Sequence, residues 1–164
     1  MIPLKANWYA VYTYPNLERR IHSELVKQAI STYLPLQKVL RQWSDRIKEL
    51  HVPLFPSYLF VHIHDHERVN VLKVAGVARF VAFEGRPAII STDEIETIRK
   101  VESVAVELEP SLLSGDWVQI MHGPLAGLKG ILFKKKGKTR FGVQLNGLRQ
   151  ALSLNVCVSL LKKL

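Results

Sequence analysis

Leu54-Phe55-Pro56-Ser57-Tyr58-Leu59-Phe60-Val61 is the densest run of aromatic and apolar side chains in the chain. Because Pro56 has no N–H to donate to a neighbouring strand, pairing is expected to begin after it. Side chains then alternate, which places Tyr58 and Phe60 on one face and two aliphatic residues on the other. A strand that is apolar on both faces needs a cover on each, so the run predicts a central strand of a sheet.

Two interpretations of the rings of Tyr58 and Phe60 remain open. In the first, both are core residues of the sheet, which is the usual place of apolar strand residues. In the second, helices of the same domain cover only the aliphatic face, and the two rings are left for the surface of a partner. The two interpretations differ in the exposed fraction that they predict for each ring.

The chain has 164 residues, of which 48% are hydrophobic, so it is long enough for one domain or two small ones. No window approaches the roughly 18 consecutive apolar residues of a membrane span. The N-terminus also lacks the basic and apolar regions of a secretion signal. These features predict a cytoplasmic protein without membrane contact. The single Cys157 cannot form an internal disulfide and, between two valines, is expected to be a buried strand residue.

The net charge of +9 is unevenly distributed along the chain. Residues 1–109 carry 14 basic and 13 acidic side chains, whereas residues 110–164 carry nine and one. Such asymmetry favours contact with a polyanion, and nucleic acid or a ribosome ahead of a membrane.

The first part of the chain begins with a strand, a helix and a hairpin. Residues 8–13 are aromatic and β-branched and predict a strand, and the apolar stripe of residues 17–30 predicts a helix. Residues 37–42 and 47–52 form two arms around the tip Trp43-Ser44-Asp45-Arg46. This pattern predicts a projecting hairpin, and its arms carry several basic side chains.

The pattern continues with a short helix or turn at residues 64–74 and a strand at residues 76–83. Ser91 then offers an N-cap for a helix with Ile95, Ile98, Val101 and Ala105 facing inward. The order of elements predicts an α+β protein with an N-terminal α/β sandwich over residues 1–106. A short linker is expected at residues 107–114.

The remaining residues, 115–164, consist of short strand patterns separated by turn residues. The predicted strands are 117–121, 130–134, 139–145, 151–154 and a last piece near 156–160. Short strands and tight turns over about fifty residues predict a small five-stranded barrel.

Residues 115–130 carry the richest local signature of this second part. Gly123-Pro124 turns the chain, and Gly127 can adopt a backbone conformation that other residues rarely adopt. Gly130 lets the next strand start close to its neighbour. The arrangement resembles the KOW motif of SH3-like barrels in transcription factors and ribosomal proteins. Its motif residues here are Gly115, Asp116, Gly123, Pro124, Gly127 and Gly130. The motif predicts a barrel whose partner is RNA, a ribosomal protein or another protein.

The two parts together resemble the NusG family of transcription elongation and antitermination factors. The resemblance rests on the aromatic strand, the Arg-bearing helix, the basic hairpin, residues 53–61 and residues 76–81, and it spans nearly the whole chain. The Phe-Pro-x-Tyr-x-Phe-Val form is closer to the specialised branch of RfaH-like and UpxY-like antiterminators than to housekeeping NusG. The resemblance implies the NusG N-terminal (NGN) fold, a mainly antiparallel sheet with flanking helices.

The resemblance also implies a partner for the first domain. In this family it binds the clamp helices of the largest catalytic subunit of bacterial RNA polymerase through an exposed apolar surface. The matching positions are Tyr12, Tyr58 and Phe60, with Phe80 and Phe83 as further candidates. For Phe80 and Phe83, core packing is the competing interpretation. The resemblance implies a monomeric, non-catalytic protein without a cofactor.

In the specialised branch, the hairpin and the first helix contact the displaced non-template DNA strand. The residues suited to this role are Lys27, Lys38, Arg41, Gln42, Trp43 and Arg46. Their charges would contact phosphates, and Trp43 would offer a stacking platform for a base. A solvated charged ribbon is the competing interpretation. Around residues 68–72 we find no counterpart of the His-Thr-Thr element with which RfaH-like proteins make a second polymerase contact.

The second domain also carries a basic hairpin. Its cations are Lys134, Lys135, Lys136, Lys138 and Arg140. They suit a ribosomal protein, RNA or a termination factor, so an RNA-binding or ribosome-associated KOW protein without polymerase contact is the main alternative function.

Enzymatic functions have weak support in the sequence. The end of a phosphate loop at Gly137-Lys138-Thr139 lacks the required first glycine, because Leu132 stands in its place. Alternating His62, His64 and His66 raise the alternative of a metal site, although such clusters are usually exposed strand ends. We therefore expect neither catalytic residues nor a metal.

Overall fold

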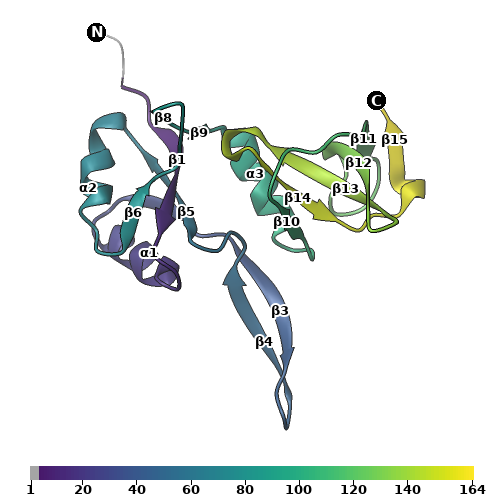
Figure 1. Cartoon of the computed structure of the whole chain (residues 1–164), viewed down its shortest axis with the longest axis horizontal. Coiled ribbons are helices and arrows are strands. Elements are labelled where there is room, and N and C mark those ends of the chain that lie inside the picture. The colour runs from purple at the N-terminus through teal and green to yellow at the C-terminus, as the bar shows by residue number, and fades with distance from the viewer. Residues whose placement is uncertain (1–3) are drawn as a thin grey trace. The chain divides into compact units, whose positions relative to one another are not determined.

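The computed structural model describes residues 4–164, which fold into two compact units (Figure 1). The boundary between the units falls between Ile95 and Glu96. This position lies inside helix α3 (Thr92–Val101) and upstream of the linker predicted at residues 107–114. Each unit is built around its own antiparallel sheet.

The first unit contains a five-stranded antiparallel sheet in which β1 and β5 are interior strands. Four strands follow the order β2-β5-β1-β6, and β9 also pairs with β1. Their bounds are β1 (Asn7–Thr13), β2 (Ser31–Tyr33), β5 (Tyr58–Ile63), β6 (Val77–Phe80) and β9 (Ile89–Ile90). The predicted central strand is confirmed, and its pairing begins at Tyr58, two residues after Pro56.

One face of this sheet is the core of the unit. Helix α1 (Glu18–Lys27) buries Ile21 and Leu25 in the same cluster as Leu59 and Val61 of β5. Ile21 and Leu25, four residues apart on one face, follow the predicted apolar stripe, whereas Val26 is exposed and the helix ends at Lys27, before residue 30. The short η1 (Asp65–Glu67) and α2 (Arg68–Leu72) contribute Val71 to the same cluster.

The predicted hairpin is confirmed as β3 (Leu36–Gln42) paired with β4 (Ile47–Pro53), and Figure 1 shows it projecting from the first unit. The N–H of Trp43 closes the turn by donating to the carbonyl of Arg46 at 2.7 Å. At the base, the Arg19 side chain of α1 donates to the carbonyl of His51. A second, smaller hairpin joins β7 (Ala82–Phe83) to β8 (Arg86–Pro87).

Helix α3 starts where the sequence predicts. The backbone N–H of Glu94 donates to the Ser91 hydroxyl at 3.1 Å, and the Glu94 carboxylate accepts from the Ser91 N–H at 3.0 Å. This reciprocal pair is a capping box. The predicted inward residues Ile95, Ile98 and Val101 are buried, but the helix ends at Val101, so Ala105 lies beyond it and is exposed.

The second unit contains one antiparallel sheet of six strands in the order β10-β14-β13-β12-β11-β15. Their bounds are β10 (Glu107–Glu109), β11 (Asp116–Ile120), β12 (Lys129–Lys135), β13 (Lys138–Leu145), β14 (Gln150–Leu154) and β15 (Leu161–Lys163). Residues 115–164 contain the predicted five strands, β11 to β15, and the sixth strand, β10, lies within the expected linker and pairs with β14. Within residues 4–164, no strand pairing joins β10 to β15, so the hydrogen-bonded ladder is open.

The end of the chain differs from the sequence prediction. Instead of a strand near residues 156–160, a 3₁₀ turn covers Val158–Leu160, and β15 follows it. Cys157 therefore lies outside any strand and is exposed rather than buried. Its Sγ lies 3.0 Å from the Ser159 Oγ, and this hydrogen bond lowers the pKa of the thiol. A further 3₁₀ turn, η2 (Asn146–Leu148), joins β13 to β14.

The glycines of the KOW-like turn behave as expected. Gly123 and Gly127 have φ values of 91° and 90°, which are open to glycine and strained for most other residues. A Cβ on Gly130 would collide with the carbonyl oxygen of Gly142 on the neighbouring strand. None of the helices in the described part of the chain is long and apolar enough to cross a membrane.

Candidate functional site: an aromatic sheet face and a basic hairpin

The face of the first sheet opposite α1 carries a continuous row of rings. We call it the aromatic face, and it comprises Trp8, Tyr12, Tyr33, Tyr58, Phe60 and His62. At one end Trp8 stacks on His62 with ring centroids 4.8 Å apart, and at the other Tyr12 lies 4.6 Å from Tyr58. Directly opposed positions in the antiparallel ladder place each of these pairs together.

Phe60 lies in the middle of the aromatic face and is inaccessible. Its exposed fraction is 0%, because Phe55 packs edge-on against it at 5.7 Å and Tyr33 stacks at 6.2 Å. The core interpretation is therefore correct for Phe60. A partner cannot contact this ring while the unit is folded, so we exclude Phe60 from the candidate polymerase-binding residues.

Phe80 and Phe83 are also less exposed than a contact surface for a partner requires. Phe80 is only 7% exposed and belongs to the core cluster, where Tyr9 meets it edge-on at 5.8 Å. Phe83 is half-buried in the small β7–β8 hairpin. Core packing is thus the correct interpretation for Phe80.

Tyr12 and Tyr58 are half-buried and remain as the accessible pair. The Arg79 guanidinium lies 4.7 Å from the centroid of the Tyr12 ring, a cation–π contact at the edge of the pair. The result is a small surface of two tyrosine rings and one cation, built on neighbouring strands.

The chain entering β5 is fixed by a buried carboxylate. Ser57, whose φ is 65°, donates its N–H to the Glu18 carboxylate at 2.8 Å, and its carbonyl accepts from the Thr13 N–H at 2.9 Å. Glu18 is buried at the start of α1. These contacts position Tyr58, the next residue along the chain.

The β3–β4 hairpin presents a cationic surface around one tryptophan. We call it the basic tip, and it comprises Arg41, Trp43, Arg46 and Lys48. The Lys48 ammonium lies 4.9 Å and the Arg46 guanidinium 5.9 Å from the Trp43 ring centroid. Arg41 stands directly opposite Lys48 in the ladder. Like charges in such positions repel, so the basic tip is suited to an anionic partner that relieves the repulsion.

The structure brings together only three of the six predicted DNA-binding residues: Arg41, Trp43 and Arg46. Lys38 is paired with Glu49 at 3.0 Å, and side-chain alternation puts Lys38 and Gln42 on the other face of the hairpin. Lys27 lies on α1 and pairs with Glu24 at 3.2 Å. The sequence prediction missed Lys48 as a binding residue. Pairing the residues on either side of the tip, Gln42 with Ile47 and then Arg41 with Lys48, would have placed it opposite Arg41.

These features all lie in the part of the chain that matches a known family. The model of the NusG family, described as transcription termination factor nusG, matches residues 6–99, more than half of the chain. The chain belongs to the NusG family. Its sheet, α1, hairpin and aromatic face therefore fall inside the family match, whereas most of the second unit lies outside it.

Individual relatives agree with this assignment. The transcription termination/antitermination protein NusG of Deinococcus radiodurans is 28% identical, over 79% of this chain and 83% of its own length. The protein of the same name from Staphylococcus carnosus is 29% identical, over 75% of this chain and 76% of its own. A solved structure of Thermotoga maritima NusG shares the fold with a TM-score of 0.57 at 22% identity, over 97% of both chains.

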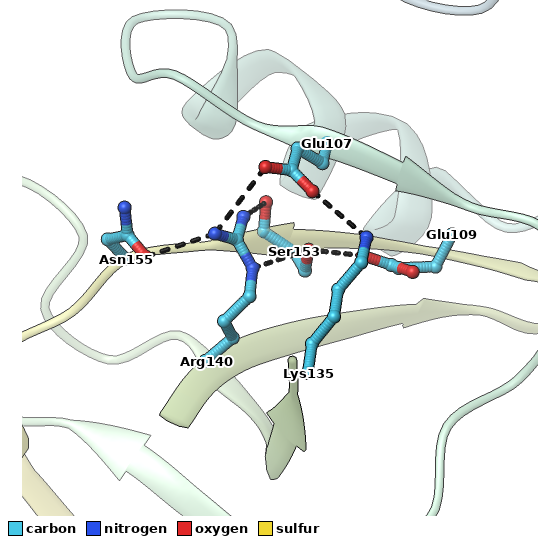
Figure 2. Close-up of polar contacts among 6 residues, drawn as sticks. All are labelled: Glu107, Glu109, Lys135, Arg140, Ser153 and Asn155. Carbon is cyan, nitrogen blue, oxygen red and sulfur yellow. Dashed lines mark hydrogen bonds and ion pairs between the residues drawn. The ribbon is translucent and has the colours of Figure 1, made fainter. Parts of the chain in front are cut away.

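In this NusG-family chain, two of the cations predicted on the second hairpin are engaged internally (Figure 2). Lys135 Nζ lies 2.7 Å from Glu109 Oε1 and 2.9 Å from Glu107 Oε2. Arg140 is buried and donates to Ser153 and Asn155. Only Lys134, Lys136 and Lys138 of the predicted basic hairpin are exposed.

The pKa values in this cluster favour the charged forms. The hydrogen bond from Lys135 and the charge of Arg140 lower the pKa of Glu107. Burial raises the pKa of Glu109, but hydrogen bonds from Lys135 and Ser153 outweigh it, so the net shift is downward. The same hydrogen bonds to the two carboxylates raise the pKa of Lys135. The three shifts therefore stabilise the ion pairs between Lys135 and the two carboxylates.

The histidines considered as metal ligands have other contacts. His62 stacks on Trp8, and His64 stacks on His66 with ring centroids 5.7 Å apart. Within residues 4–164, no group of three or more His, Cys, Asp or Glu side chains is arranged to hold a metal ion.

The second unit contains an apolar pocket beside its KOW-like turn. The pocket has a volume of about 320 Å³. It is lined by Gly123, Pro124 and Leu125 of the turn and by Leu154, Cys157 and Leu160. Its size and lining suit one or two apolar side chains of a protein partner.

Proposed function

We propose that this protein is a bacterial transcription elongation and antitermination factor that binds the clamp helices of the largest catalytic subunit of RNA polymerase. The observation that supports this is the accessible pair Tyr12 and Tyr58, whose rings lie 4.6 Å apart beside the Arg79 guanidinium. Sealing such rings against helices supplies roughly 1.5–3 kcal/mol per fully buried side chain before the cost of association. The protein acts in the cytoplasm, as a monomer, by binding rather than by catalysis.

Within the family, we propose that it belongs to the specialised RfaH-like and UpxY-like branch. Support comes from the Phe-Pro-x-Tyr-x-Phe-Val form of residues 55–61 and from the basic tip. In this proposal the tip contacts the displaced non-template DNA strand, with Trp43 stacking on a base and the cations contacting phosphates.

For the second unit we propose an SH3-like KOW barrel that recruits a ribosomal protein or a termination factor. Strands β11 to β15 supply its five strands, and β10 is an addition at the edge. The pocket beside Leu125 supports a protein partner, because most of its lining is apolar.

The polymerase proposal is tested by a pull-down with purified bacterial RNA polymerase. We expect Tyr58→Ala and Tyr12→Ala each to weaken binding at least tenfold while the fold is kept. Tyr14→Ala is the matched control, because Tyr14 is 60% exposed and lies outside the aromatic face. Full binding by a folded Tyr12→Ala, Tyr58→Ala double variant would remove the proposed surface.

The alternative, an RNA-binding or ribosome-associated KOW protein without polymerase contact, is favoured by the exposed Lys134, Lys136 and Lys138. It predicts an RNA affinity that falls steeply with salt. For single-stranded RNA, the logarithm of the binding constant should fall with the logarithm of the salt concentration by a slope of about 0.7 for each phosphate that a cation contacts. Substituting the three lysines by glutamine would then abolish RNA binding, whereas the Tyr12→Ala and Tyr58→Ala variants would bind RNA as the wild type does. Salt-insensitive or absent RNA binding contradicts this alternative.

A further inference from the structure

Residues 107–113, which lie in the predicted linker, are held to the sheet of the second unit at both ends, by residues 107–109 and by Leu113. We call this segment the strap. Its first part is β10, which pairs with the edge strand β14 in the register Glu107↔Ser153, Leu108↔Leu152 and Glu109↔Ala151. The strap thus occupies the hydrogen-bonding edge that β14 would otherwise present.

Two carboxylates of the strap enter a site built by the sheet (Figure 2). Glu109 Oε1 accepts from Lys135 Nζ at 2.7 Å and from the Ser153 hydroxyl at 2.6 Å. Glu107 accepts from Lys135 at 2.9 Å, and its other oxygen lies 3.6 Å from Arg140 Nη1. Glu109 is only 7% exposed, so its carboxylate is a specific ligand of this site rather than a surface charge.

The end of the strap is held in a different way. The Gln144 side-chain amide accepts from the Leu113 N–H at 2.8 Å and donates to the Leu113 carbonyl at 3.2 Å. The Leu113 side chain lies over Gly142, where a Cβ would collide with it. The sheet therefore recognises three features of the strap: its extended backbone, two carboxylates at alternate positions, and an apolar side chain further along.

The sheet is continuous without the strap. Strands β14, β13, β12, β11 and β15 pair in succession, which leaves β14 as an edge when β10 is removed from the order. An uncovered edge strand is a template for pairing with another chain. Nothing in the strand order requires β10 for the pairing of the other five.

We propose that the β14 edge, together with Lys135, Arg140 and Gln144, is a docking site for an extended acidic segment of a partner protein, and that the strap is its built-in competitor. The partner segment carries carboxylates two residues apart, as Glu107 and Glu109 are in the strap. This proposal goes beyond polymerase binding and does not depend on it.

The forces that hold the strap are compatible with exchange. The Glu107 side chain is 56% exposed, so its ion pairs are screened by solvent and salt. The strap has the advantage of being tethered, which corresponds to an effective concentration in the millimolar range. A partner that makes the same contacts and buries additional apolar surface can overcome that advantage.

The test uses the full chain and a labelled synthetic peptide with the sequence of residues 105–113, added in trans and followed by fluorescence anisotropy. In E107Q/E109Q the strap loses its charges while Lys135, Arg140 and Gln144 stay intact. We expect this variant to bind the peptide at least tenfold more tightly than the wild type does. A peptide with Gln at both Glu positions should bind the variant at least tenfold more weakly than the parent peptide does.

D45N/E84Q is the matched control, because it removes two exposed carboxylates of the first unit and should bind the peptide as the wild type does. L113S is a second strap variant that loosens the contact at Gly142 and should also bind the peptide more tightly. Equal affinity of the wild type and both strap variants would overturn the proposal. So would a loss of second-unit structure in E107Q/E109Q by circular dichroism, because the strap would then be an obligatory strand. An unstructured RNA oligonucleotide that displaces the peptide at equal concentration would also overturn it, since the site would then accept any polyanion.

Discussion

Phe60 and Tyr58 stand two residues apart on the same face of the same strand, yet one is sealed and the other is accessible. The alternation of side chains along a strand predicts that the two rings share a face, but it does not predict which ring other residues cover. Phe55 and Tyr33 close over Phe60, whereas Tyr58 lies at the end of the row beside Tyr12. The roles of the two rings therefore differ: Phe60 supports the surface and Tyr58 belongs to it.

Phe60→Ala should lower the free energy of unfolding by about 3–5 kcal/mol, because it leaves a cavity in a fully packed position. Tyr58→Ala should cost clearly less, since its half-buried ring loses less contact area on truncation. Urea denaturation followed by circular dichroism measures both. A smaller loss for Phe60→Ala than for Tyr58→Ala would contradict the assignment of Phe60 to the core.

At the scale of elements, the β3–β4 hairpin concentrates charge where stability alone does not favour it. Arg41 opposes Lys48, and Trp43 is 47% exposed at the tip. These features destabilise an isolated ribbon, and binding of a single strand of nucleic acid would offset them.

Trp43→Ala should weaken binding of a labelled single-stranded DNA oligonucleotide at low salt by about 1–3 kcal/mol, the loss of one stacked base. Arg41→Gln should weaken binding across all sequences and reduce the salt slope by about 0.7. Trp117→Ala is the matched control, because Trp117 is 49% exposed but lies on β11. DNA affinity that is equally sensitive to both tryptophans would argue against the basic tip.

The strap gives the second unit a predictable response to pH. Because the pKa values of Glu107 and Glu109 are lowered in the folded chain, their contribution to stability is present above the ordinary value of 4.5. It is lost as the pH falls through their lowered values. The raised pKa of Lys135 keeps its contribution intact below 10.5, and it is lost only as the pH rises through the raised value.

We therefore expect the urea midpoint of the wild type to drop more steeply below pH 4.5 than that of E107Q/E109Q. Between pH 5 and pH 10, the midpoint of the wild type should change less than it does in acid. Circular dichroism at a series of pH values measures both curves. Parallel curves for the two proteins in acid would mean that these carboxylates do not contribute.

At the scale of the whole molecule, the number of cations on the second hairpin overstates how many of them a polyanion can reach. Of the five cations on the second hairpin, Lys135 and Arg140 are neutralised within the second unit. The two hairpins therefore each expose three cations, which are Lys134, Lys136 and Lys138 on the second hairpin and Arg41, Arg46 and Lys48 on the basic tip.

If the protein belongs to the specialised branch, mapping of its occupancy along transcribed genes should find it on a few operons only. Tyr58→Ala should remove that signal while the protein level is unchanged. Occupancy on most transcribed genes would instead indicate a general elongation factor.

The sequence by itself determined the local structure of this protein. The period of apolar residues placed α1, the hairpin and the central strand, Ser91 with Glu94 marked the start of α3, and the glycines marked the KOW-like turn. These features depend on interactions between near neighbours in the chain, which a residue pattern records.

Only the tertiary structure decided which side chains are covered and which charges are neutralised. Tyr33 of β2 helped to seal Phe60, Lys135 was paired with Glu107 and Glu109, and residues 107–113 became a strap instead of a linker. Glu107 and Glu109 lie 26 or more residues from Lys135 in the chain. Contacts over such separations are set by how the strands assemble, and no local pattern encodes them.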